Sequence, residues 1–187
     1  MTNITLLVIS DTHRSLRDEQ EKIIDRVREE CDLVITLGDV PFEGLLYIKP
    51  DYGVLGNHDY FGLLGTWDIH GRLVEKNGVT ITGLQGSSRY KEGNFPMYSQ
   101  EESMCIELPK ADILISHDSI YRNIVDDAHT GLKCISKYIE EKKPFLNIHG
   151  HHHKQELYSY KDTNIVCVYK CAKITVKDNK VYVEHLF

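Results

Sequence analysis

Long apolar segments and secretion signals are both missing from this sequence. No stretch approaches the roughly 18 consecutive apolar residues that a membrane-spanning helix needs. The first apolar run, residues 4–9, is too short for a signal peptide, and no basic segment precedes it. These absences favour a cytoplasmic protein with no membrane partner.

Positive charge is also scarce. The chain has 22 Lys and Arg residues against 28 Asp and Glu residues, which gives a formal net charge of −6. Extended nucleic acid is therefore not an expected partner, because an acidic protein repels a phosphate backbone at long range. An anionic substrate would need local positive charge, and a bound metal could supply it.

Paired cysteines are lacking as well. The five cysteines are odd in number and scattered, and no C-x-x-C motif occurs. The spacing of Cys167 and Cys171 does not suit a zinc knuckle. We expect reduced, buried cysteines, as in an intracellular protein.

What remains is an ordinary globular composition. The chain has 187 residues, 41% of them apolar and 27% charged, which suits one compact domain over residues 1–187. No internal repeat, low-complexity tract or linker divides it. The sequence predicts a single α/β domain.

The first forty residues have a β-α-β pattern. Residues 4–10 and 32–39 are apolar runs typical of buried central strands. An amphipathic helix is predicted between them, with Ser15 and Asp18 as its capping box. This order predicts a parallel strand pair joined by a right-handed crossover.

The rest of the chain alternates in the same way and then becomes β-rich. Strands are predicted within residues 51–59, 111–119 and 145–149, a hairpin over 71–84 around Asn77-Gly78, a loop over 85–99 and a helix over 130–142. Residues 155–187 contain short alternating segments, which predict an antiparallel meander. The C-terminal third is therefore expected to be mostly β-structure.

Residue types that bind metals follow each of five predicted strands. They are Asp11 and His13, then Asp39, then Asn57, His58 and Asp59, then His117, then His151, His152 and His153. Each motif alone also fits solvated loop residues or a packed histidine. Because ligands of open α/β sheets bind at the carboxyl ends of the strands, the five sets together favour one shared site.

This ordered set, DTH, GD, GNHD, H and GHHH, resembles the calcineurin-like metallophosphoesterases over residues 4 to about 155. Residues 68–90, the loop from Gly93 to about 102 and residues 126–153 also resemble a subgroup of small cyclic-nucleotide and phosphodiesterase-like members. The resemblance implies a four-layer α/β/β/α sandwich with mixed sheets.

The resemblance also implies a dinuclear metal centre. One metal would be held by Asp11, His13, Asp39 and His153, and the other by Asp39, Asn57, His117 and His151. Asp39 would bridge, because its two carboxylate oxygens can be shared. The mixed nitrogen and oxygen ligands suit two divalent transition metals, Mn foremost, with Fe, Zn, Ni or Co as alternatives.

In this scheme a metal-bridging hydroxide attacks the phosphorus atom. His58 would stabilise the transition state or protonate the leaving group. Asp59 would either orient His58 or only cap its loop. Asn57 and His58 would also contact the substrate. Where many family members carry an arginine after the GD motif, this chain has GDVPFEGLL, and Arg89 is a candidate replacement, with a solvated arginine as the alternative.

The histidine run 149–153 divides into different predicted roles. His149 is still on a strand, so a packing role is expected for it, and Gly150 would give the turn room to pass close to the metals. In an extended segment His151 and His153 would point to one side. His152 would point away, and we expect it to be replaceable.

The leading hypothesis is a dinuclear metal-dependent phosphodiesterase that hydrolyses a small phosphate ester or diester, with a cyclic nucleotide among the candidates. The alternatives are a phosphomonoesterase of the same fold and a non-catalytic interaction scaffold. A homo-oligomer is left open. His70 and His129 have no place in the ligand scheme and are predicted to be structural or rim residues.

Overall fold

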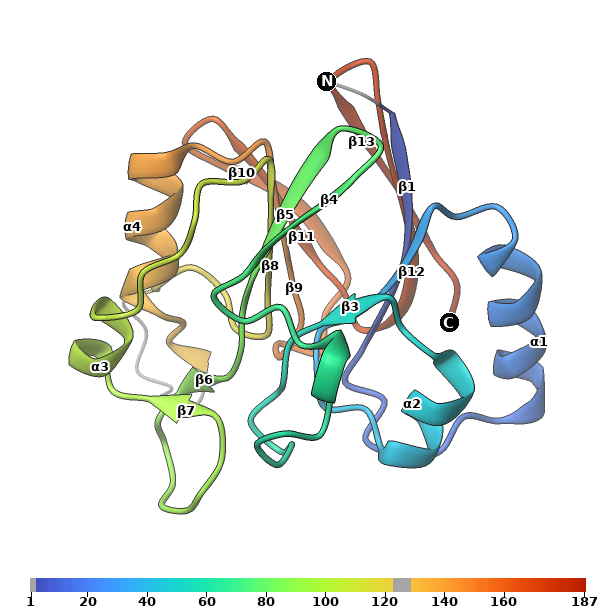
Figure 1. Ribbon diagram of the computed structural model, residues 1–187, viewed down its shortest axis with the longest axis horizontal. Coiled ribbons are helices and arrows are strands. Elements are labelled where there is room, and N and C mark those ends of the chain that lie inside the picture. The colour runs from blue at the N-terminus through green and yellow to red at the C-terminus, as the bar shows by residue number, and fades with distance from the viewer. Residues whose placement is uncertain (1–2, 123–128) are drawn as a thin grey trace.

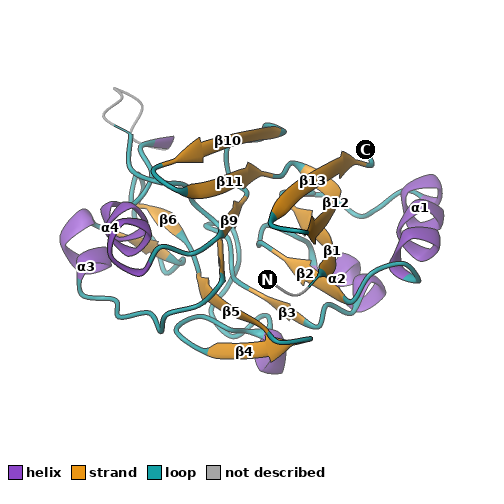
Figure 2. Cartoon of the chain, turned by 90° about the horizontal axis from the view of Figure 1, so that it is seen from above, coloured by secondary structure: helices purple, strands orange, loops and turns teal. Residues whose placement is uncertain are grey.

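Two β-sheets packed face to face form the centre of the protein (Figure 1). This computed structural model describes residues 3–122 and 129–187, so residues 126–128 of the subgroup resemblance lie outside the described residues. Helices cover the outer faces of both sheets (Figure 2). The predicted four-layer α/β/β/α sandwich with mixed sheets is confirmed.

The first sheet has the strand order β13-β12-β1-β2-β3. Its strands are β1 (Ile4–Ser10), β2 (Leu33–Thr36), β3 (Tyr52–Gly53), β12 (Lys170–Lys177) and β13 (Lys180–His185). β1, β2 and β3 run parallel, as the β-α-β pattern predicts, and β12 pairs antiparallel with β1.

The second sheet has the order β10-β11-β9-β8-β5-β4. Its strands are β4 (Leu73–Lys76), β5 (Val79–Leu84), β8 (Ile113–Ser116), β9 (Leu146–His149), β10 (Glu156–Tyr160) and β11 (Thr163–Cys167). The four inner strands are mutually parallel, and β4 and β10 are antiparallel edges. Two short strands, β6 (Ser87–Ser88) and β7 (Met97–Tyr98), form a separate pair within the predicted 85–99 loop.

The C-terminal tail is β-rich, but the prediction of a single meander is wrong. β10 and β11 form a hairpin in the second sheet, whereas β12 and β13 form a hairpin in the first. Alternating apolar residues indicate a strand without indicating its partner. Here β11 pairs with β9 and β12 pairs with β1, so the tail ties the two sheets to each other.

The helices are α1 (Asp18–Arg28), α2 (Phe42–Ile48), α3 (Gln100–Met104) and α4 (Lys133–Lys142), with a 3-10 turn η1 (Gly65–Trp67). The predicted capping box of α1 is wrong: the Gln20 side chain accepts from the Arg17 amide at 3.0 Å, so the helix begins after Ser15. α2 and α3 were not predicted, since their one or two turns are too short for a clear helical period. Within the described residues, no helix is long and apolar enough to cross a membrane.

Apolar side chains fill all three interfaces between the four layers. The largest cluster lies between the sheets, with residues such as Leu6, Ile35 and Ile148 fully buried. A second cluster joins α1 and α2 to the first sheet, and a third joins α4 to the second sheet. Burial of each such side chain contributes about 1.5–3 kcal/mol, so the sheets are a firm base for the loops at their ends.

Candidate metal centre

All five predicted sets of ligands gather at one edge of the two sheets, toward the bottom of Figure 1. β1, β2 and β3 end there in the first sheet, and β8 and β9 end there in the second. Parallel strands present their carboxyl ends at the same edge. The site therefore lies between the two sheets and takes residues from both.

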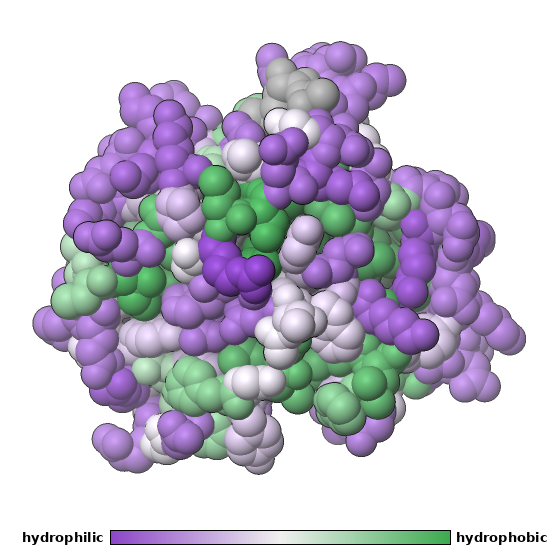
Figure 3. All heavy atoms as spheres, in the orientation of Figure 1, coloured by the Kyte–Doolittle hydropathy of each residue, from purple (hydrophilic) through white to green (hydrophobic). Residues whose placement is uncertain are grey.

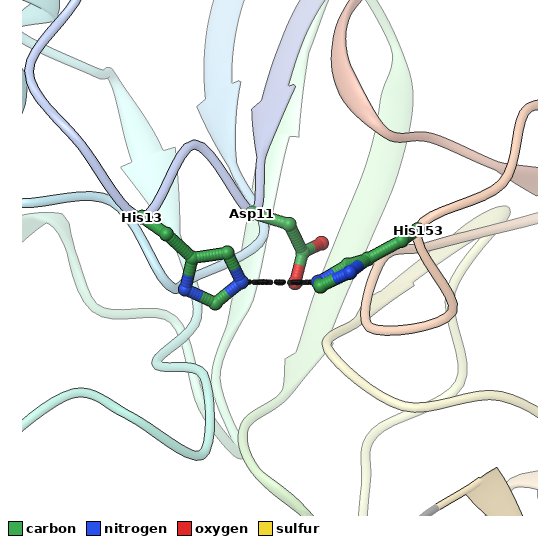
Figure 4. Close-up of side chains that lie close together, drawn as sticks. All are labelled: Asp11, His13 and His153. Carbon is green, nitrogen blue, oxygen red and sulfur yellow. Dashed lines mark hydrogen bonds and ion pairs between the residues drawn. The ribbon is translucent and has the colours of Figure 1, made fainter.

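Asp11 is the buried centre of the first group. Its Oδ2 accepts from the Ser10 hydroxyl at 2.5 Å and from the His151 amide at 2.8 Å. Its Oδ1 is buried and has no hydrogen-bond partner among the described residues. This oxygen instead faces His153 Nε2 at 3.6 Å and His13 Nε2 at 3.9 Å (Figure 4).

The two imidazoles converge on that oxygen from loops 140 residues apart, with 3.0 Å between His13 Nε2 and His153 Nε2. Two nitrogens and an unsatisfied carboxylate oxygen directed at one point form a donor set for a transition metal. A buried oxygen without a partner costs about 1–3 kcal/mol or more, and a cation would remove that cost. These residues fit a bound metal.

A second group joins Asp11, Asp39 and His117, all of them buried. His117 Nδ1 lies 2.8 Å from the Leu37 carbonyl, which can only accept, so the neutral ring carries its proton there. Its Nε2 then presents a lone pair to Asn57 Oδ1 at 2.8 Å and lies 3.6 Å from Asp39 Oδ2. Such convergence of acceptors also fits a cation.

The electrostatics show a site that attracts positive charge. Burial alone lowers the pKa of His117, but the carboxylates of Asp39 and Asp11 outweigh it and raise that pKa. The nearby Asp11 carboxylate raises the pKa of His153. Burial would raise the pKa of Asp11, and the neighbouring imidazoles and hydroxyl more than reverse that effect.

The structure thus brings together all seven residues predicted as metal ligands. His151 joins them through its ring, 5.0 Å from that of His117. Asp39 uses Oδ1 to accept from the His58 amide at 2.9 Å, and its Oδ2 faces His117. Asp11 belongs to both groups, so the bridging role of Asp39 stays a prediction.

Five of these seven residues have the left-handed backbone that non-glycine residues disfavour. They are Asp11, His13, Asp39, His151 and His153, with φ between 51° and 65°. Each such residue costs about 1–2 kcal/mol, and strain of this kind concentrates at functional sites. The prediction that His151 and His153 lie in an extended segment is therefore wrong.

His152 belongs to neither ligand group, but its side chain is packed inside the protein. Its side chain is 7% exposed, whereas that of His153 is 49% exposed. The ring packs beside those of His129 and His149, and Nε2 lies 3.6 Å from Oδ1 of the buried Asp118. The residue expected to point away is thus a packed interior residue, because the positive φ values turn the chain.

His149 and Gly150 occupy the predicted environments. His149 is fully buried with Nδ1 2.9 Å from the Gly150 carbonyl, and burial lowers its pKa to about 3. A Cβ atom on Gly150 would lie 2.1 Å from Ser10 Oγ and 2.5 Å from Asp11 Oδ2. The backbone passes the Asp11 carboxylate so closely that only glycine fits.

His58 is exposed beside the metal groups, with its ring 5.3 Å from that of His13. Burial of part of its ring lowers the pKa of His58. Asp59 does not turn toward it: Asp59 Oδ2 accepts from the Gly56 amide at 2.7 Å and the Asp39 amide at 2.9 Å. These contacts correspond to the alternative prediction, in which Asp59 only caps its loop. Burial and the nearby Asp39 charge raise the pKa of Asp59 to about 6.

A cavity of about 230 Å³ opens beside this site. His13, Asp39 and His58 line one side, and Phe42, Tyr60 and Leu63 line the other. The apolar patch over α2 at the lower right of Figure 3 belongs to the same region, where Phe42 is 51% exposed. There is room for a small ester next to the metal ligands.

Arg89 is engaged elsewhere. Its guanidinium forms an ion pair with Glu102 at 2.6 Å and donates to the Met97 carbonyl at 3.2 Å. It lines a different hollow, with Ser99 and Tyr121. These contacts do not place Arg89 among the metal ligands, and a role in substrate binding stays a prediction without support from this geometry.

Sequence reasoning missed three residues near the ligands. The Tyr90 hydroxyl accepts from Asn57 Nδ2 at 2.9 Å, and its neighbour Lys91 lies on the same loop. Asp118 is fully buried and accepts from the Ser88 and Ser119 amides. No sequence signal marks Tyr90 or Lys91, and only the position of Asp118 directly after a ligand hinted at its involvement.

His70 and His129, which have no place in the predicted ligand scheme, lie in different surroundings. The Gln85 amide donates to His70 Nδ1 at 3.4 Å, and the ring stacks near Tyr98, as expected of a structural residue. His129 lies at the rim, with its ring 5.2 Å from that of His151. Both observations agree with the predicted structural or rim roles.

Solved structures of similar fold extend across nearly the whole chain. The protein TT1561 of Thermus thermophilus is 13% identical with a TM-score of 0.64, and the match covers 98% of this chain and 99% of that one. A predicted phosphoesterase from Streptococcus pneumoniae is 15% identical with a TM-score of 0.55, covering 98% and 89%. A Vps29 single mutant from Entamoeba histolytica is 14% identical with a TM-score of 0.50, covering 98% of both chains. At these identities the likeness shows the fold alone.

No curated protein sequence matches the chain. Residues 4–182, however, match the Calcineurin-like phosphoesterase superfamily domain. The matched range includes all seven predicted ligands, His58 and nearly all of both sheets. The chain therefore belongs to the calcineurin-like phosphoesterase superfamily.

Proposed function

We propose that this protein is a dinuclear metal-dependent phosphodiesterase acting on small phosphodiesters. The observation that carries the proposal is Asp11 Oδ1, which is buried without a hydrogen bond and faces two imidazole nitrogens. The complete ligand set argues for an enzyme over a non-catalytic scaffold. The cavity beside His58 favours a substrate of modest size, and a phosphomonoesterase is the alternative.

Asp11, His13, Asp39 and His153 would hold one divalent cation, and Asp39, Asn57, His117 and His151 the other, with Mn foremost. Bound there, two cations supply an activated water and stabilise the charge that develops on the phosphoryl oxygens. The carbonyl of Leu37 keeps the proton of neutral His117 on Nδ1, which leaves Nε2 free as a ligand. The exposed His58 would protonate the leaving alkoxide.

Metal-resolved hydrolysis tests this function. The protein is stripped with a chelator, reloaded with Mn, Ni, Zn or Mg, and assayed with bis-p-nitrophenyl phosphate, p-nitrophenyl phosphate and cyclic nucleotides. We expect turnover only after reloading and a preference for the diester. Absence of hydrolysis with every metal and ester would rule the proposal out, and a preference for the monoester would favour the alternative.

Two variants separate metal binding from catalysis. Asp39→Ala should lose both metals and all turnover, since Asp39 would supply a ligand to each of them. His58→Ala should keep the metals while kcat falls about 100-fold or more, because a proton donor is lost. Metal content by mass spectrometry and kcat give the readouts. Unchanged turnover in His58→Ala would remove this residue from the mechanism.

A further inference from the structure

The loop between β6 and β7, residues 89–96, is fastened to the candidate metal centre. Tyr90 accepts a hydrogen bond from Asn57 Nδ2, so it contacts a predicted ligand directly. Farther along, the Phe95 ring lies 6.0 Å from the Tyr60 ring, which lines the cavity beside His58. The two contacts hold this 89–96 loop against the open side of the site.

Lys91 extends its ammonium group over both aromatic rings of this loop. Lys91 Nζ lies 5.3 Å from the centre of the Tyr90 ring and 4.8 Å from that of Phe95. Both distances are within the range of a cation–π contact. Such contacts hold the ammonium in place without neutralising its charge.

The charge of the nearby Arg89, by contrast, is neutralised by an ion pair. Arg89 is paired with Glu102, whereas in residues 3–122 and 129–187 no carboxylate lies within ion-pair distance of Lys91. Among the described residues, Lys91 therefore keeps a positive charge without a carboxylate partner, on an acidic protein with a net charge of −6. An anion is the partner that this arrangement lacks.

The contacts of its two rings place Lys91 next to the site. The Tyr90 ring under its ammonium carries the hydroxyl that is bonded to Asn57. The Phe95 ring under the same ammonium contacts Tyr60, which lines the cavity together with His58.

We propose that Lys91, held by the rings of Tyr90 and Phe95, binds the anionic phosphate group of the substrate beside His58. The inference rests on the proposed function, because it requires a phosphate ester at this site. It supplies the cation that the segment GDVPFEGLL does not provide, and it assigns that role to Lys91 in place of Arg89. The interaction is with charge, so a dianionic ester should depend on Lys91 more than a monoanionic one.

Steady-state kinetics of the Mn-loaded protein test the role of Lys91. In Lys91→Met, KM for bis-p-nitrophenyl phosphate should rise about 5- to 20-fold with kcat within about 2-fold, as for loss of one charged hydrogen bond. KM for the dianionic p-nitrophenyl phosphate, and the inhibition constant of inorganic phosphate, should rise more. Lys91→Arg should restore most of the loss.

Lys161→Met is the matched control. Lys161 lies over the Tyr160 ring at 5.8 Å on the turn between β10 and β11, away from the metal ligands, so its loss should leave KM unchanged. Metal content should equal that of the wild type in all variants, which excludes an indirect effect through Asn57.

The outcomes distinguish failure of the proposed function from failure of the role of Lys91 alone. If the metal-loaded wild type hydrolyses no ester, the proposed function fails. If it hydrolyses them and Lys91→Met leaves KM and phosphate inhibition unchanged, only the role of Lys91 fails. A loss in Arg89→Met that equals or exceeds that in Lys91→Met would also overturn the assignment.

Discussion

His152 and His153 are adjacent in the chain and lie in opposite environments. His153 is half exposed with Nε2 directed at Asp11, whereas His152 is buried beside the fully buried Asp118. The consecutive histidines resemble an affinity tag, but they therefore have different roles. One residue is placed to hold a metal, and the other packs behind the site.

We predict that the two alanine variants fail differently. His152→Ala should lower the free energy of unfolding by about 1–3 kcal/mol, because it opens a cavity and removes the imidazole that faces the buried Asp118 carboxylate. His153→Ala should leave the stability of the metal-free protein nearly unchanged and lower Mn affinity. Urea unfolding and Mn titration of both proteins give the readouts. A His152→Ala protein of wild-type stability would restore the idea that this residue is replaceable.

At the scale of elements, the conformational strain of the site is located in the loops that follow the strands. Five predicted ligands have positive φ, and two loops approach so closely that glycine is required. A Cβ on Gly56 would lie 2.0 Å from Asp39 Oδ1, and one on Gly150 would meet Asp11. The strands on both sides are buried and paired, which is how such loops remain in place.

Gly150→Ala tests this close approach. The new methyl group would collide with Ser10 and Asp11, so the loop must shift and Mn affinity should fall about 10-fold or more. Gly71→Ala is the control: Gly71 has a positive φ, unlike Gly150, but a Cβ there meets nothing within 4 Å. Its Mn affinity should equal that of the wild type. Isothermal titration with Mn compares the two, and equal affinities would contradict the steric argument.

At the scale of the whole molecule, the site joins the two sheets. Ligands from β1 and β2 belong to the first sheet, and ligands from β8 and β9 to the second. A cation bound between them would link the sheets and relieve the buried acceptors. Metal binding should therefore stabilise the entire fold and not only its loops.

Thermal unfolding gives the corresponding prediction. At free Mn of about 100 times Kd, stability should increase by about 2.7 kcal/mol, which corresponds to a rise in Tm of about 5–10 °C. Chelation should reverse the rise, and Asp39→Ala should show none. A wild-type Tm that is unaffected by Mn would mean that the site does not bind this metal in the folded state.

Many parts of the fold and the site could be predicted because their signals are local. Apolar runs indicated the central strands, and Asn77-Gly78 indicated the hairpin, where both residues have positive φ as a two-residue turn requires. The capping residues of α1 were predicted wrongly because several residues near its start could cap the helix. In the structure the Gln20 side chain accepts from the Arg17 amide and so completes the cap. The prediction of an extended segment at His151 and His153 was wrong because both residues have positive φ.

The sequence by itself determined the chemistry of the site and the order in which the strands deliver it. Residue type and position after a strand are local properties, and the carboxyl ends of parallel strands share one edge. Only the tertiary structure decided which sheet each C-terminal hairpin joins, that Asp59 caps a loop, and that Arg89 pairs with Glu102 while Lys91 lies over two aromatic rings. These depend on contacts between segments far apart in the chain, where packing selects one partner among several that are chemically equivalent.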